Sequence, residues 1–155
     1  MTVAAEGVKV YGNIPHATIA NFSLTYGWDI LRWLKWNTRL GYSLGRDNEG
    51  EPLPLISPFA YTTNLNVRLG RFQGKAEVQG NARQSHYGKK YGETPTAAWA
   101  IVNLSANYQW SMHNVQCTLR AGIENLLDKR YTSYADWCDI PQKGRNFYMN
   151  LSVEL

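Results

Sequence analysis

The sequence predicts an all-β protein, an antiparallel transmembrane β-barrel segment of about eight long strands. Three observations predict this fold. Apolar and polar residues alternate in repeated segments, which places them on opposite faces of a strand. These segments run to about 10–13 residues, longer than the roughly 5–6 of a mean globular strand and close to the roughly 9–11 of a tilted membrane-spanning strand. The connections between them are alternately short and long.

The clearest alternation occupies residues 34–45. Its even-numbered positions are apolar apart from Thr38, and its odd-numbered positions are polar or glycine. A helix would mix the two kinds of residue on each face. The same pattern predicts further strands, which in chain order occupy residues 17–28, 58–70, 74–86, 97–110, 115–124 and 145–155, and a shorter eighth strand over residues 7–13.

The predicted connections separate into two classes. Short links fall near 29–33, 71–73 and 111–114, and long links fall near 46–57, 87–96 and 126–143, with 13–16 as a short link on the long-loop side. Bacterial outer-membrane barrels have short periplasmic turns and longer outside loops. The alternation therefore predicts that the long links lie outside the cell and that the last strand runs inward.

Aromatic residues gather near the predicted strand ends, as amphipathic rings do at the two membrane interfaces. Those near the short turns are Trp28, Trp33, Trp36, Tyr108 and Trp110, and those toward the long loops are Tyr42, Phe59, Tyr61 and Trp99. The polar strand faces are expected to point into the barrel, with the charged residues Lys35, Arg39, Lys75, Glu77, Arg83 and Arg120.

Composition excludes several other classes of protein. With 44% hydrophobic residues the chain has enough apolar surface to fold, and its longest apolar run, residues 97–102, is far shorter than a spanning helix requires. The net charge of +4 comes without a compact basic block, so no nucleic-acid partner is expected. We find no catalytic motif, no cofactor motif and no metal-ligand spacing, so neither catalytic residues nor a cofactor are predicted.

The two cysteines, Cys117 and Cys138, are not expected to pair. One falls near the inner end of a predicted strand and the other in an outside loop, whereas bridged Cα atoms lie within about 7 Å. Cys138 together with a histidine or methionine of another loop stays open as a copper site.

Four segments carry a more specific signal. Residues 122–131, GIENLLDKRY, closely resemble the "GxxNLFDKxY" segment near the C-terminus of TonB-dependent outer-membrane receptors. Residues 140–147 resemble the "IPxPGRxF" stretch that leads into their last strand, and residues 50–58 resemble their "GxPLPxIPP" loop. Residues 11–14 followed by 17–22 resemble their "YxN…AxIxGxE" stretch. The resemblance covers essentially the whole chain, residues 1–155.

The resemblance implies the last third of a 22-stranded barrel, without the N-terminal plug domain and without the short box that contacts the energy-coupling protein. The sequence departs from the family at Leu127, where phenylalanine is usual, and at Leu155, where most members end in an aromatic residue. The second departure concerns the signal for the barrel-assembly machinery, which the resemblance assigns to Tyr148, Leu151, Val153 and Leu155.

The motif residues are expected to shape a loop rather than to contact substrate, because Gly, Pro, Asn and Asp dominate turns. They are Asn125, Leu126, Leu127, Asp128, Tyr131, Pro141, Gly144 and Arg145. Substrate contact is expected from aromatic and charged residues of the long loops, since such side chains together can bind an anionic ferric chelate. The candidates are His86, Tyr87, Lys89, Lys90, Tyr91, Tyr134, Asp136 and Trp137.

The function that the resemblance implies is energy-coupled uptake of a scarce nutrient, such as a ferric siderophore, haem, cobalamin or copper, across the outer membrane of a Gram-negative bacterium. It is transport rather than enzymatic catalysis. The implied partners are membrane lipid and lipopolysaccharide, the plug and the remaining barrel strands, the TonB complex and the barrel-assembly machinery.

Two alternatives stay open on the sequence alone. One is a self-contained eight-stranded membrane barrel with an anchoring or structural role, and the other is a soluble β-barrel that binds a small ligand inside. An eight-strand segment would expose unpaired edges near 7–13 and 144–155, which lipid does not tolerate. We therefore expect this chain to be incomplete by itself.

Overall fold

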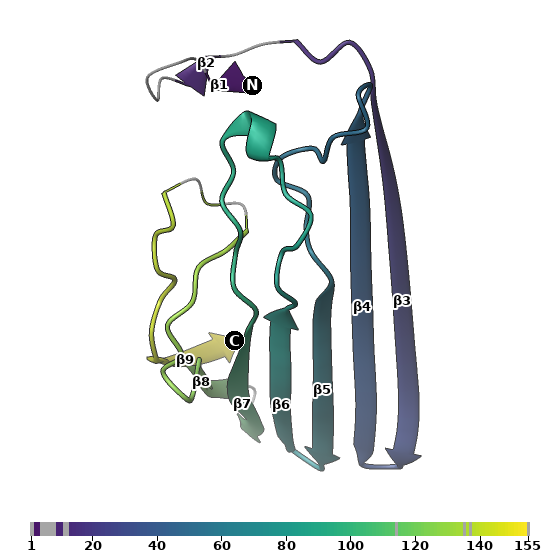
Figure 1. Cartoon of the computed structure of the whole chain (residues 1–155). Helices are drawn as coiled ribbons and strands as arrows, with labels where there is room; N and C mark the ends of the chain where they lie inside the picture. The colour runs from purple at the N-terminus through teal and green to yellow at the C-terminus, as the bar shows by residue number, and fades with distance from the viewer. Residues whose placement is uncertain are drawn as a thin grey trace.

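The computed structural model describes residues 2–3, 9–10, 13–113, 115–134, 136 and 138–154. Its main element is one antiparallel sheet in which spatial order follows chain order (Figure 1). The strands of this sheet are β3 (Ala17–Leu31), β4 (Leu34–Asp47), β5 (Ala60–Leu69), β6 (Phe72–Asn81), β7 (Trp99–Met112), β8 (Val115–Glu124) and β9 (Asn146–Glu154). A short 3-10 helix, η1 (Lys89–Tyr91), interrupts the connection between β6 and β7.

The predicted long strands are confirmed, and the predicted eighth strand is not part of the sheet. In its place Lys9–Val10 forms strand β2, which pairs with strand β1 (Thr2–Val3) in a separate two-stranded sheet. The rest of residues 7–13 lies outside the described part of the chain, apart from Asn13. The main sheet therefore has seven strands.

The strand register gathers the apolar positions of all seven strands on one face. Leu24 lies opposite Leu40, which lies opposite Tyr61 on the next strand. On the other half of the sheet Leu104 lies opposite Ile123, which lies opposite Phe147. Because side chains alternate along each strand, the polar positions form the opposite face. The predicted alternation thus produces one apolar and one polar face across the sheet.

The apolar face is exposed. Phe22 is 61% exposed and Met149 is 77% exposed, and the buried hydrophobic side chains among the described residues are Leu53, Tyr91 and Ile101. A soluble sheet would cover such a face with a second layer, whereas a membrane barrel turns it toward lipid. The arrangement therefore favours a membrane-facing sheet over a soluble barrel with an apolar interior.

Aromatic side chains mark both ends of the apolar face. Tyr26 and Trp36 pack edge to face at the short-turn end, with ring centroids 6.0 Å apart, and Phe59 and Tyr61 pack at the long-loop end. Trp99 also lies at the long-loop end, as expected, because β7 begins there, but its side chain is on the polar face. Its register partner is Asn81, and its ring packs on Tyr131.

The strand boundaries differ from the predicted ones mainly after β6. Residues 82–86 were expected to continue this strand, but β6 ends at Asn81 and the chain turns into the long connection. Arg83 therefore lies in that connection rather than on the polar strand face, unlike Lys35, Arg39, Lys75, Glu77 and Arg120. In the described part of the chain, no helix is long and apolar enough to cross a bilayer.

Candidate functional site

Three long connections lie together at one end of the sheet, while the short turns lie at the other end (Figure 1). We call residues 48–59, 82–98 and 125–145 the loop layer. The layer follows directly from strand direction, because each of these segments links the same ends of neighbouring antiparallel strands. Most of the residues predicted to contact a substrate fall within it.

The first loop folds back over β4. Pro52 forms an isolated bridge with Arg46, and the backbone N–H of Leu53 donates to the carbonyl of Gly45 at 3.0 Å. The side chain of Ile56 covers Gly45 so closely that a Cβ there would lie 2.7 Å from Ile56 Cδ1. Glycine at this position therefore allows the loop to pack against the strand.

A buried hydroxyl ties the second loop to the end of β4. Tyr91 is 3% exposed, and its hydroxyl donates to Asp47 Oδ2 at 2.7 Å. The hydrogen bond to Asp47, with burial as the second cause, raises the pKa of Tyr91 above its usual value of 10.0. Lys90 Nζ lies 2.6 Å from Glu49 Oε2 and 3.8 Å from Asp47 Oδ2, and the hydrogen bond to Glu49 raises the pKa of Lys90.

A second polar cluster lies around Glu93, which is buried. Its carboxylate accepts hydrogen bonds from the backbone N–H groups of Leu55 and Gly88, at 3.1 and 2.7 Å, and from Gln84 Nε2 at 3.1 Å. Gln84 is itself only 1% exposed. Buried polar groups are stabilised when their hydrogen bonds are satisfied, so this carboxylate holds the first two loops together.

The third loop is organised by the residues of the 122–131 motif. Asn125 is 2% exposed, and its Nδ2 donates to the carbonyls of Lys129 and Lys143 while its Oδ1 accepts from the N–H of Lys129. Asn125 also has a φ of 49°, a left-handed conformation that asparagine tolerates. One side chain thus connects the start and the end of this loop.

Asp128 closes the same loop at its far end. Its Oδ1 accepts a hydrogen bond from the N–H of Arg145 at 2.8 Å, and a Cβ on Gly144 would lie 2.7 Å from that oxygen. Leu126 donates its N–H to the carbonyl of Val102, which fixes the loop to β7. Leu127, in contrast, is 69% exposed.

Tyr131 packs against the polar face rather than toward solvent. Its ring lies 4.2 Å from that of Trp99, centroid to centroid, and burial raises the pKa of Tyr131. Pro141 lies beside this pair, lining a cavity of about 260 Å³ with Trp99 and Tyr131. The loop therefore covers the end of β7.

The structure separates the predicted substrate-contact residues into two groups. His86, Lys89 and Lys90 are exposed, and Tyr87 is half-buried with Lys89 Nζ 5.4 Å from its ring centroid. Tyr91 lies inside the loop layer, so in this arrangement its ring is not presented to solvent.

In the third loop Tyr134 is half-buried, and both carboxylate oxygens of Asp136 accept backbone N–H groups, those of Cys138 and Ile140. Trp137 lies outside the described residues. Cys117 lies on β8 and Cys138 in the third loop, and both are free thiols. Among the described residues no group of three or more His, Cys, Asp or Glu is arranged to hold a metal ion.

Sequence inspection missed Asp47, Gln84 and Glu93. Each is a polar residue in a segment rich in polar residues, so nothing in the local pattern separated them from solvated loop residues. Their structural role arises from the packing of two loops that are distant in the chain and that contact each other at these residues.

A family model for the TonB dependent receptor-like beta-barrel matches residues 2–126. The chain belongs to this family. A solved structure of the "Copper transporter OprC" has a similar fold, with a TM-score of 0.78 and 22% sequence identity over 87% of this chain. The chain spans about a quarter of that structure, 23% of its length. No curated protein matches this sequence.

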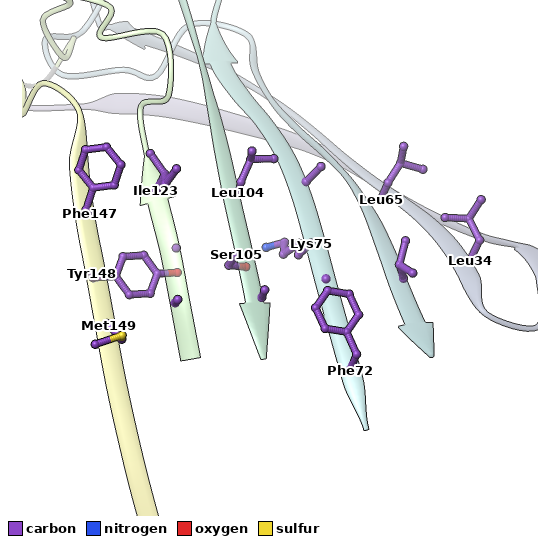
Figure 2. A pocket seen from close by; sticks show the side chains of 16 residues that line it. Leu34, Leu65, Phe72, Lys75, Leu104, Ser105, Ile123, Phe147, Tyr148 and Met149 are labelled. Atoms are coloured by element: carbon purple, nitrogen blue, oxygen red, sulfur yellow. The ribbon is translucent and has the colours of Figure 1, made fainter. Parts of the chain in front are cut away.

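In a TonB-dependent receptor barrel, the apolar face contacts lipid and the polar face lines the interior. Figure 2 shows the apolar face of the sheet, where Leu65 projects from β5, Leu104 from β7, Ile123 from β8 and Phe147 from β9. They border an open hollow of about 850 Å³ whose lining is mostly apolar, and its residues Lys75, Ser105 and Tyr148 belong by register to the opposite face. A small-molecule site adds convergent polar groups to such a lining, so we interpret the hollow as lipid-contact surface.

The last strand of the receptor barrel segment, β9, places Leu151 and Val153 on the apolar face. Tyr148 belongs by register to the polar face, where it lies opposite Gly122. Leu155 lies outside the described residues. The residues assigned to the assembly signal thus divide between the two faces.

Proposed function

We propose that this chain forms part of an outer-membrane receptor for energy-coupled uptake of a scarce nutrient. Residues 1–155 would supply the C-terminal part of the barrel. The plug, the remaining barrel strands and the TonB complex would be its partners in transport, and the barrel-assembly machinery would insert it. Membrane lipid and lipopolysaccharide would surround the apolar face.

The observation that carries this proposal is the family match over residues 2–126 together with a seven-stranded sheet that has one exposed apolar face and one polar face. This combination suits a wall between lipid and a hydrated interior. Neither alternative has similar support. The described residues show no pairing of β3 with β9, as a closed small barrel would need, and the apolar side chains are not enclosed, as a soluble barrel would need.

We propose that the substrate contacts of this segment come from the second loop, from the exposed His86, Lys89 and Lys90 and the half-buried Tyr87. These residues combine an aromatic ring, an imidazole and cations at the loop end of the sheet. The pattern suits an anionic chelate, through charge and contact with the ring. The substrate would be a ferric siderophore, haem, cobalamin or copper complex.

The test of the function is uptake by cells with and without the gene for this chain. Labelled ferric siderophore, haem, cobalamin and copper would each be supplied at limiting concentration, with and without a protonophore that removes the energy source. Loss of protonophore-sensitive uptake of one nutrient supports the proposal. Unchanged uptake of all four, with the protein found outside the outer membrane, contradicts it.

The same cells test the extent of the barrel. An antibody against residues 87–96 would be used to probe outer membranes from cells starved of the nutrient. A band several times larger than 17.6 kDa is expected if these strands belong to a longer receptor. A band at 17.6 kDa would contradict the proposed place of this segment within a larger barrel.

The loop contacts are tested with His86→Ala combined with Tyr87→Ala, because both side chains reach solvent without holding the loop to β4. Thr94→Ala, an exposed position in the same loop, serves as the control. Weaker substrate binding in the first variant alone supports the assignment, and equal binding in both variants removes this loop from the site.

A further inference from the structure

A cavity of about 390 Å³ lies where β4 extends beyond its neighbour β5. The β4–β5 pairing ends at Gly41 and Ala60, whereas the β3–β4 pairing continues to Ala17 and Asp47. The last residues of β4 therefore lie beyond the end of β5, and residues 51–53 bond to their backbone in its place. Residues 50–59 and 82–86 cover this end of β4, and the cavity lies between them and the strand.

The charged residues that line this cavity are all basic. Arg46 and Arg83 border it together with His86, and no aspartate or glutamate does. Both arginines are exposed, and within the described part of the chain neither is within 4.0 Å of a carboxylate. The carboxylates of the neighbouring loop residues, Asp47 and Glu93, are engaged by other groups. The cavity is thus positively charged and lacks internal neutralisation.

The same cavity is continuous with the apolar face. Tyr42 and Leu44 line it, and both lie on that face of β4, at its loop end. Phe59 lines it from the neighbouring segment. In a membrane barrel this level corresponds to the headgroup region, where the hydrocarbon contact ends and the outside loops begin. A ligand here would meet cations on one side and apolar groups on the other.

We propose that this cavity binds the phosphate of an outer-leaflet lipid headgroup, with the lipid's acyl chains passing along Tyr42 and Leu44. Guanidinium groups bind phosphate through two parallel hydrogen bonds, and two such groups line this cavity. Ser85 adds a hydroxyl to its wall, 3.1 Å from His86 Nδ1, whereas the Ser57 hydroxyl donates to the carbonyl of Pro58. A free phosphate ion would use the arginines but would gain nothing from the apolar side. The inference rests on the proposed membrane location.

The first experiment uses the unmodified protein, purified from outer membranes in detergent. Phosphatidic acid or phosphatidylcholine of the same chain length is added, and retained lipid is counted by mass spectrometry of the intact complex. We expect about tenfold more retention of phosphatidic acid, because its charge-assisted contacts with the arginines are not offset by a choline group. Equal retention of the two lipids overturns the inference.

A competition experiment with inorganic phosphate distinguishes a site for a lipid phosphate from a site for a free phosphate ion. Inorganic phosphate at the same concentration as phosphatidic acid should displace little of the lipid. Complete displacement would mean a site for free phosphate, and would overturn the assignment to a lipid.

The second experiment replaces the arginines. Arg46→Gln combined with Arg83→Gln should lower retention of phosphatidic acid about tenfold, because both guanidinium groups are lost. Arg120→Gln, an exposed arginine on the polar face of β8, is the matched control and should retain it normally. Equal losses in both variants contradict the proposed site. Where the double variant does not assemble, equal retention of the two lipids by the wild type still overturns the inference.

Failure of this inference can be separated from failure of the proposed function. If the protein fractionates away from the outer membrane, the proposed function fails. If it lies in that membrane and takes up its nutrient but retains both lipids equally, only the lipid site fails.

Discussion

The hydroxyl of Tyr91 donates a hydrogen bond to Asp47 Oδ2 at 2.7 Å, across 44 positions of the chain. This contact joins the η1 segment to the end of β4 and buries the tyrosine ring between two loops. Tyr91, which the sequence placed among the candidate substrate contacts, is thus held inside the loop layer by a hydrogen bond. The loop layer is held by specific hydrogen bonds between residues that are distant in the chain.

Removing the Tyr91 hydroxyl should loosen the second loop. Tyr91→Phe keeps the ring but leaves Asp47 without this donor, so the loop should open more often. We expect trypsin to cleave after Lys89 and Lys90 several times faster than in the wild type. Tyr87→Phe is the matched control in the same loop, and equal cleavage of the two variants would contradict the role of this hydrogen bond.

The same contact should weaken at alkaline pH. The folded-state pKa of Tyr91 is raised above its usual 10.0, so its stabilisation is complete below pH 10 and is lost as the pH rises through the folded pKa. The raised pKa of Lys90 acts in the same direction. The tyrosinate absorbance of the wild type minus that of Tyr91→Phe should titrate above 10.0. A midpoint at or below that value would contradict the geometry.

Gly122 should not tolerate a side chain. It lies directly opposite Tyr148, whose ring would collide with a Cβ at this position. We expect Gly122→Ala to cost about 1–3 kcal/mol through overpacking and to lower the amount of protease-resistant protein in the outer membrane. Gly41→Ala is the control, because a Cβ there meets nothing within 4 Å. Tyr148→Ala should partly rescue the Gly122→Ala variant, and absence of rescue would rule out the collision.

Asn125 should be needed for its two donated hydrogen bonds rather than for its size. Asn125→Asp preserves the shape but replaces the Nδ2 donor with an acceptor facing the carbonyls of Lys129 and Lys143. We expect a local cost of about 1–3 kcal/mol, because buried polar groups lose their partners. Faster trypsin cleavage after Lys129, Arg130 or Lys143 would report it. Asn150→Asp, on exposed β9, should have no effect.

The assignment of the apolar and polar faces is tested by adding a charge to the apolar face and removing a charge from the polar face. Leu40 lies on the apolar face, so Leu40→Lys should cost about 2–4 kcal/mol near the bilayer midplane. Lys35 lies on the polar face in an exposed pair with Asp29, so Lys35→Leu should cost little. The amount of folded barrel in the outer membrane gives the comparison. Equal loss from both variants would reject the assigned faces.

The sequence by itself determined the strands and their two faces. The alternation in residues 34–45 was sufficient to place Leu40 and Lys35 on opposite faces, because side-chain direction along a strand is a local property. The 122–131 motif indicated a shaped loop, because Asn and Asp favour turns through hydrogen bonds to nearby backbone, and Asn125 and Asp128 make such bonds.

Only the tertiary structure decided which loop residues are buried and which can meet a ligand. Tyr91 and Tyr87 are both tyrosines of one loop, yet one is enclosed and the other is accessible, because Asp47 lies next to the first. Arg46 and Arg83 line the same cavity only because β4 extends beyond the end of β5 and two loops fold over this end of β4. Contacts between residues distant in the chain depend on register and on loop packing, which no local pattern records.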